Sequence, residues 1–223
     1  MHLPPVTSSP APLAAPYGGE PGVPVGVMLL GVRVTAYAII STAEHQRRET
    51  AGMGAVINPA LLDRLMDLPI GISVTDPVAW AEMADQPRGV AELHEDGARI
   101  IRRLESTLTI ADVIVDAARG KELRAVQDAS LFAGFTRRWI AAAPSRIPDA
   151  AMLEAKLCGV GIVDQRRSQL LLPAEKPEGL TRDGWSWLLE EKTYRRWLTR
   201  RAGNHEQESS SRATDGASDA RAS

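Results

Sequence analysis

The chain has 223 residues and a formal net charge of -2, so it can form one full-sized domain or two small ones. Its 44% hydrophobic and 24% charged residues are ordinary for a soluble globular protein, and the charge provides no overall field toward nucleic acid or anionic lipid. The lone Cys158 excludes an internal disulfide framework and argues against a cysteine-based metal site.

Both ends of the chain are predicted to be disordered arms. Residues 1–23 are rich in Pro, Gly and Ala, and residues 202–223 are polar and show no periodicity. The start lacks the basic and apolar regions of a secretory leader, and the longest apolar run, VPVGVMLLGV, is too short to span a bilayer. We therefore expect a cytoplasmic protein without a membrane partner, with a single α/β domain over residues 24–201.

The first half of this domain, residues 24–95, is predicted to be mostly helical with at least one strand. VGVMLLGVRVTAYAII, residues 25–40, indicates one long bent strand or two shorter ones. Asn58 before Pro59 and Asp76 before Pro77 are typical of helix starts, because each pairs a capping side chain with a proline at the first helical position. GISV, between these two helices, predicts a short strand, and the topology of this half stays open.

The second half, residues 96–201, shows the alternation of a mixed sheet with crossover helices. Residues 97–104 and 109–117 are predicted to pair as a β-hairpin. The elements expected after it are a helix in 120–135, with Leu123, Val126 and Leu131 at helical spacing, a strand over 136–143, a helix over 149–157, a strand over 160–164, its hairpin partner over 169–174 and a last helix over 183–198. We expect Asp149 to cap the helix over 149–157, which Gly159 ends, and Asp183 to cap the last helix.

Residues 109–119 also allow a second interpretation. Thr109 and Asp112 have the spacing of a capping box, and Gly120 could end a helix. The run of Val113, Ile114 and Val115 favours the strand, because β-branched side chains lose rotamer freedom in a helix.

The elements from Gly97 onward resemble the restriction-endonuclease-like, or PD-(D/E)XK, fold. The points of resemblance are the hairpin, the helix after its second strand, the strand RRWIAAA and the helix-to-strand step LEAKLCGVGIVD. They cover roughly the second half of the ordered chain. The resemblance implies a metal-dependent nuclease site with an acid, a spacer and a lysine on one strand. Asp116 takes the place of the acid, Ala118 stands where the lysine belongs, and the nearest other candidates are Asp112, Glu105 and Lys121.

The last predicted helix points to a different function. It carries several aromatic residues and has no acid between Lys192 and Arg201. Such a surface suits phosphate contacts and stacking, or the interface with a protein partner. The residues concerned are Lys192, Arg195, Arg196, Trp197, Arg200 and Arg201. The alternative is that these cations only complement the helix dipole and reflect an arginine-rich codon bias.

Other kinds of site have little support in the sequence. His45, in AEHQRRE, is interpreted as a surface residue among charges, and no phosphate-binding glycine loop or serine elbow occurs. We therefore predict no metal ligands and no cofactor. The expected function is non-catalytic: a binding or regulatory protein with a nuclease-like core that acts on nucleic acid or a protein partner. The alternative is a divergent nuclease with a divalent metal, using Asp116, Asp112, Glu105 and Lys121.

Overall fold

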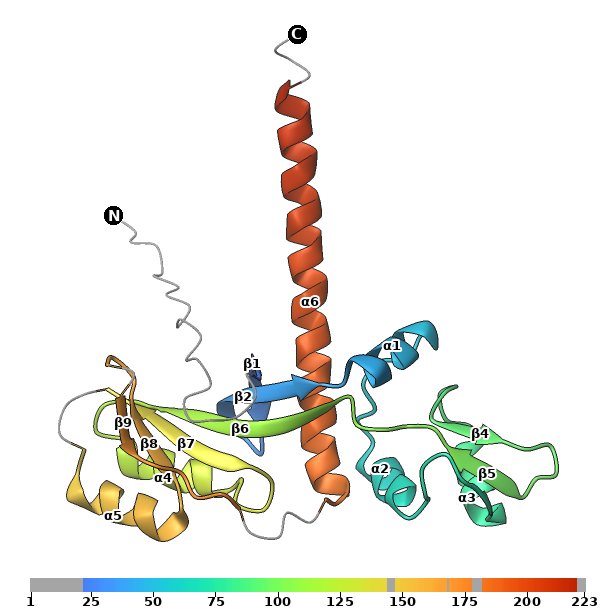
Figure 1. Cartoon of the computed structure of the whole chain (residues 1–223), viewed down its shortest axis with the longest axis horizontal. Coiled ribbons are helices and arrows are strands. Elements are labelled where there is room, and N and C mark those ends of the chain that lie inside the picture. The colour runs from blue at the N-terminus through green and yellow to red at the C-terminus, as the bar shows by residue number, and fades with distance from the viewer. Residues whose placement is uncertain (1–21, 144–146, 168, 178–181, 220–223) are drawn as a thin grey trace. The chain divides into compact units, whose positions relative to one another are not determined.

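The computed structural model describes residues 22–143, 147–167, 169–177 and 182–219, with side chains up to residue 203 (Figure 1). These residues contain six helices, a mixed six-stranded sheet and a three-stranded sheet. The predicted α/β class is therefore confirmed. Most of the predicted N-terminal arm, residues 1–21, lies outside the described residues.

The described elements follow the chain in this order. They are β1 (Val23–Leu29), β2 (Val32–Ile40), α1 (Thr42–Thr50), α2 (Pro59–Met66), β3 (Ser73–Thr75), α3 (Pro77–Met83), β4 (Ala91–Leu93), β5 (Arg99–Arg102), β6 (Leu108–Ala117), α4 (Glu122–Ser130), β7 (Arg137–Ala142), α5 (Asp149–Cys158), β8 (Gly161–Asp164), β9 (Gln169–Leu172) and α6 (Gly184–Asp219).

The contacts divide the chain into two compact units. Unit 1 includes Val32–Ile39 and Ile110–Leu180, and unit 2 includes Val25–Gly31, Ile40–Thr109 and Thr181–Ser223. Each unit is therefore assembled from separate stretches of chain.

Unit 1 is built on the larger sheet, in which β2, β6, β7, β8 and β9 are successive neighbours. β6, β7 and β8 are parallel, as the predicted crossover helices require, and β8 and β9 form the predicted antiparallel hairpin. α4 and α5 lie side by side on one face of this sheet (Figure 1). α5 begins at Asp149, as predicted, but the predicted cap is wrong: Pro148, whose backbone is extended, occupies the cap position, and Asp149 is the first helical residue.

The strand interpretation of residues 109–119 is confirmed, and the helical alternative is wrong. β6 buries Val113, Ile114 and Val115 in succession, so both of its faces are covered. A central strand of a parallel sheet needs such a continuous apolar run. On the next strands the Trp139 ring lies directly over Gly161, where a Cβ atom would overlap it.

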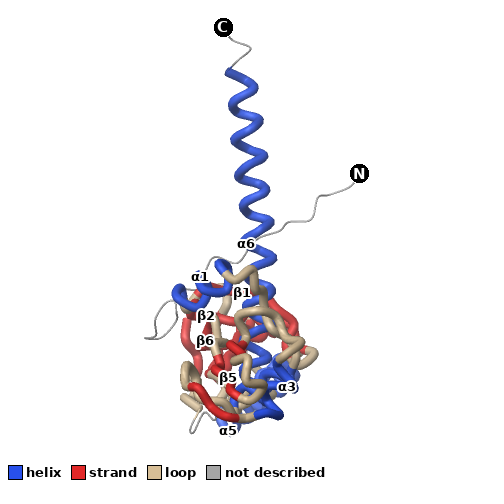
Figure 2. Tube along the Cα trace, turned by 90° about the vertical axis from the view of Figure 1, so that its right-hand side faces the viewer, coloured by secondary structure: helices blue, strands red, loops and turns tan. Residues whose placement is uncertain are grey.

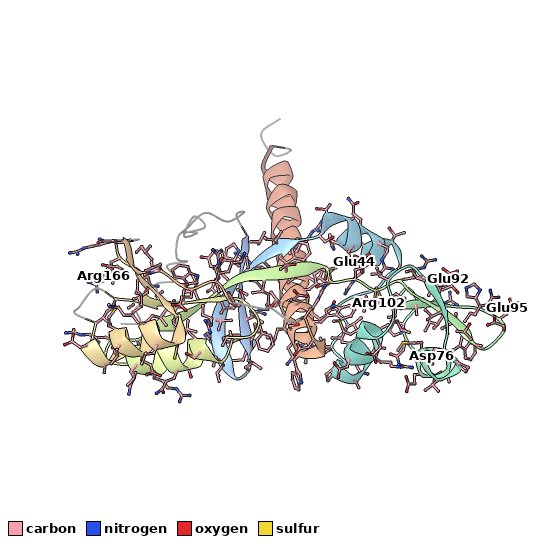
Figure 3. The ribbon with its side chains drawn as sticks, turned by 60° about the horizontal axis from the view of Figure 1, so that its bottom comes forward. Glu44, Asp76, Glu92, Glu95, Arg102 and Arg166 are labelled. Atoms are coloured by element: carbon pink, nitrogen blue, oxygen red, sulfur yellow. The ribbon has the colours of Figure 1, made fainter. Side chains whose placement is uncertain are left out.

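The predicted hairpin between residues 97–104 and 109–117 is wrong. β5 pairs with β3 and β4 in the three-stranded sheet, whereas β6 pairs with β7 in the larger one. β5 is held in unit 2 because Ile100 is buried in its core and the Arg102 guanidinium donates to the carbonyl oxygens of Leu65 and Leu68 at 2.7 and 3.1 Å (Figure 3). The polar segment after β5 is therefore a connection and not a turn.

The core of unit 2 lies among α2, α3, the three-stranded sheet and the start of α6. Its helix starts were predicted correctly. The Asn58 and Asp76 side chains accept from the backbone N–H of Leu61 and Ala79, and Asp183 accepts from Ser186 at 2.7 Å. The indole of Trp187, on α6, is fully buried in this core.

α6 is one unbroken helix of 36 residues (Figure 2). It continues past Leu198, where the predicted helix ends, to Asp219, and so includes most of residues 202–223, which the sequence predicts as a terminal arm. No proline occurs between residues 182 and 219, so nothing in the sequence blocks the backbone hydrogen-bond ladder. Among the described residues, no helix is both long enough and apolar enough to cross a bilayer.

Candidate functional site

The predicted cationic residues of α6 occupy one side of that helix. At 100° per residue, Lys192, Arg195, Arg196 and Arg200 fall within an arc of about 140°. Lys192 is half-buried, and the three arginines are exposed. Within the part of the chain that the structure describes, no ion pair involves Lys192, Arg195 or Arg196. We call Lys192, Arg195, Arg196 and Arg200 the cationic face of α6.

Most charged arginines elsewhere in unit 2 are neutralised by acids. The ion pairs include Arg64 with Asp76 at 2.7 Å and Arg182 with Glu190 at 2.7 Å. Lys192, Arg195 and Arg196 differ from these arginines, because their charges are available to an external anion.

The other two predicted binding residues of α6, Trp197 and Arg201, are engaged within unit 2. Arg201 Nη1 lies 2.6 Å from His45 Nε2, and its guanidinium lies over the Trp197 ring, 5.4 Å from the centroid. Trp197 also makes an edge contact with His45, at 4.9 Å between centroids. The structure therefore gives Trp197 and Arg201 a role in holding α6 against α1.

His45 itself is buried, so its interpretation as a surface residue is wrong. Its Nδ1 lies 2.8 Å from the Tyr194 hydroxyl. Because an arginine can only donate, Nε2 must accept from Arg201, and Nδ1 carries the proton that it donates to Tyr194. A neutral histidine thus connects α1 to two residues of α6.

A buried ion pair with α1 also anchors α6. Arg48 and Glu191 are both fully buried, and the two guanidinium Nη atoms donate to the Glu191 carboxylate at 2.8 and 2.6 Å. Arg48 also donates to Glu44 at 2.9 Å and to the carbonyl oxygen of Glu105 at 2.6 Å. Hydrogen bonds with Glu44 and Glu191 keep the pKa of Arg48 above its ordinary value despite burial, which acts to lower it.

The acids around Arg48 are satisfied from other sides as well. Glu191 accepts from the backbone N–H of Val56 at 2.8 Å and from the Trp187 indole at 3.3 Å. Glu44, on α1 (Figure 3), also accepts from Arg47 at 2.6 and 2.8 Å. Burial acts to raise the pKa of Glu44, but hydrogen bonds from the two arginines lower it below its ordinary value. This fully paired network fixes the position of α6 in unit 2.

Sequence reasoning missed this network. The spacing of Glu44 and Arg48 is that of an ion pair on one helical face, which is a usable signal in AEHQRRE. The partner Glu191 is 143 residues away from Arg48, and no local pattern points to it.

The nuclease candidates Asp112 and Asp116 lie on β6 of unit 1, and their carboxylates have different surroundings. Asp112 is buried, and its two oxygens accept from Arg137 and the Trp139 indole, both at 2.8 Å. The Asp116 carboxylate keeps contact with solvent and accepts no hydrogen bond from the described residues. Partial loss of hydration raises its pKa. The negative charges of both acids also affect Tyr37. Burial is the main cause that raises the pKa of the Tyr37 hydroxyl, and these two charges raise it further.

The other two nuclease candidates do not complete a metal site. Glu105 is exposed and belongs to unit 2, and Lys121 is exposed just before α4 in unit 1. With Asp112 already paired and Asp116 four strand residues away, about 13 Å along β6, these side chains do not fit a divalent ion. Over the described stretches, no group of three His, Cys, Asp or Glu residues is placed to hold a metal.

Comparison of the chain with protein-family models, with curated proteins and with solved structures gave no match.

Proposed function

We propose that this protein is a non-catalytic nucleic-acid-binding protein that contacts phosphates through the cationic face of α6. The observation that carries the proposal is the cationic face itself: no acid occurs between Lys192 and Arg200. Lys192, Arg195 and Arg196 form no ion pair among the described residues. Phosphate contacts of this kind supply most of the sequence-independent affinity for nucleic acid.

The way α6 is held supports the proposal. The Arg48–Glu191 pair and the His45–Tyr194 hydrogen bond fix the helix before any ligand arrives. The backbone that carries the cations is then already ordered, so within the protein binding costs only the conformational entropy of the side chains. Because the overall charge is -2, the chain as a whole does not attract nucleic acid, and the proposed attraction comes from this local surface.

The pairing of Asp112 favours this function over the nuclease alternative. A carboxylate that accepts from Arg137 and Trp139 would lose both bonds if it bound a metal. The proposal therefore assigns no reaction to the chain.

The test compares two matched double variants. Arg195→Ala/Arg196→Ala removes two cations from α6, and Arg166→Ala/Arg167→Ala removes two exposed, adjacent arginines from the β8–β9 turn of unit 1 (Arg166 is labelled in Figure 3). Binding of fluorescently labelled single-stranded and duplex DNA is measured by polarisation over a series of salt concentrations.

We expect the wild type to bind with an affinity that falls steeply with salt. Arg195→Ala/Arg196→Ala should weaken binding and reduce the slope of log K against log salt by about 2, or about 1 for each lost phosphate contact. Arg166→Ala/Arg167→Ala should leave the slope unchanged. Absence of binding by the wild type, or an equal loss in both variants, would contradict the proposal.

A further inference from the structure

α5 presents its larger apolar side chains to solvent and its smaller ones to the protein. Ala151 and Ala155 are fully buried, whereas Leu153 and Leu157 are 59% and 75% exposed. These leucines are four residues apart, so they lie on one face, opposite the alanines. An amphipathic helix that served only its own domain would show the reverse arrangement.

The neighbouring helix α4 continues this pattern. It packs on unit 1 through Ala125, Val126 and Ala129, while Leu123 and Leu131 are 40% and 51% exposed. Because α4 and α5 lie side by side on one face of the sheet (Figure 1), the helical layer of unit 1 exposes four leucines. We call Leu123, Leu131, Leu153 and Leu157 the leucine face.

We infer that the leucine face binds a second copy of this chain. The charges beside it identify the occupant. Relative to Leu153 and Leu157, Glu154 lies about 80° to one side of α5 and Lys156 about 80° to the other. Neither forms an ion pair among the described residues. Asp149 lies on the same flank as Lys156, at the start of the helix. At the level of Leu153 and Leu157, a surface with an acid on one flank and a base on the other complements a copy of itself better than a partner of uniform charge.

The charges also fix the direction of pairing. If two copies of α5 pack in parallel about a two-fold axis, opposite flanks meet, and Glu154 of each copy faces Lys156 of the other. If they pack antiparallel, like flanks meet and Glu154 faces Glu154. Parallel pairing is therefore favoured, by the rule that governs charged flanking positions in coiled coils. Since only two short helices contribute, the dimer belongs to the small, weak class of interfaces, with dissociation in the micromolar range.

The experiment measures self-association by sedimentation velocity over micromolar concentrations of the full chain. We expect a monomer–dimer equilibrium, which Leu157→Asp should weaken at least about tenfold. Val78→Asp is the matched control, because Val78 is 63% exposed on α3 of unit 2. Circular dichroism of each variant separates loss of association from loss of folding.

A charge exchange gives the sharper readout. Glu154→Lys alone and Lys156→Glu alone should each weaken the dimer, and the combination should restore it, because only the combination makes opposite charges face each other again. A wild type that stays monomeric, a loss of dimer in Val78→Asp, or a combination weaker than both single variants would overturn the inference.

Discussion

Arg48 joins α1 to α6 through a fully buried ion pair with Glu191. Replacing it with Met leaves Glu191 as a buried charge without its main partner, because the guanidinium supplies two of the hydrogen bonds to that carboxylate. Breaking a buried ion pair from one side costs about 3–5 kcal/mol. We expect Arg48→Met to lower the free energy of unfolding by about that amount, measured by urea denaturation.

An exposed ion pair provides the control. Arg103 donates to Glu92, and the two side chains are 44% and 52% exposed. Pairs of this kind contribute about 0–1 kcal/mol. Arg103→Met should therefore change stability by less than 1 kcal/mol, and a loss similar to that of Arg48→Met would show that burial is not the cause.

Asp116 allows a prediction about pH. Partial loss of hydration raises the pKa of its carboxyl above the ordinary 3.8, so the folded protein binds this proton more tightly than the unfolded chain. The contribution of Asp116 to stability is then present below pH 3.8 and lost as the pH rises through the folded pKa. Asp116→Asn should be more stable than the wild type at neutral pH and equally stable below pH 3.8, as followed by thermal unfolding.

The same residue tests the nuclease alternative. If labelled DNA is cleaved in the presence of manganese and Asp116→Asn abolishes the cleavage, the acid is catalytic and the non-catalytic proposal fails. We expect no cleavage by either protein, because the neighbouring Asp112 is committed to Arg137 and Trp139.

At the level of elements, the contact between β7 and β8 depends on a glycine. A Cβ atom at position 161 would overlap the ring of Trp139. Gly161→Ala forces this ring away from Asp112, to which its indole donates, and overpacking of this kind costs about 1–3 kcal/mol. The urea midpoint of Gly161→Ala should fall accordingly.

Gly26, on β1, is the comparison, since nothing lies within 4 Å of the position its Cβ would take. Gly26→Ala should raise stability by about 0.5–1 kcal/mol, because alanine loses less conformational freedom on folding. If Gly26→Ala also lowered stability, an added Cβ atom would destabilise a strand even where it meets no neighbour. The loss in Gly161→Ala would then not be evidence for the Trp139 contact.

The elements that sequence reasoning predicted correctly are those with local causes. The caps at Asn58 and Asp76 and the β-branched run of β6 act through neighbours in the chain. The pairing of β5 was mispredicted because it depends on β3, β4 and the distant carbonyls of α2. For the candidate site, the cations of α6 could be found from the sequence, but the anchoring of Arg201 on His45 could not, since 156 residues separate them.

At the scale of the whole molecule, neither unit corresponds to a continuous segment. Residues 110–180 contain most of unit 1 but not β2, the neighbour of β6 in the sheet. A fragment of these residues would expose the edge of β6 and lack Tyr37, which packs with Trp139 and Ile114. We expect this fragment to show no cooperative thermal transition by circular dichroism, and a sharp transition would show that β2 is dispensable.

The sequence separation of Arg48 and Glu191 also affects how the protein is made. At synthesis rates of roughly 5–20 residues per second, Glu191 follows Arg48 by roughly 7–30 s. During this interval Arg48 has no carboxylate of α6 to pair with, and the apolar residues that Trp187 covers stay exposed to solvent. Completion of unit 2 therefore waits for translation of the last helix.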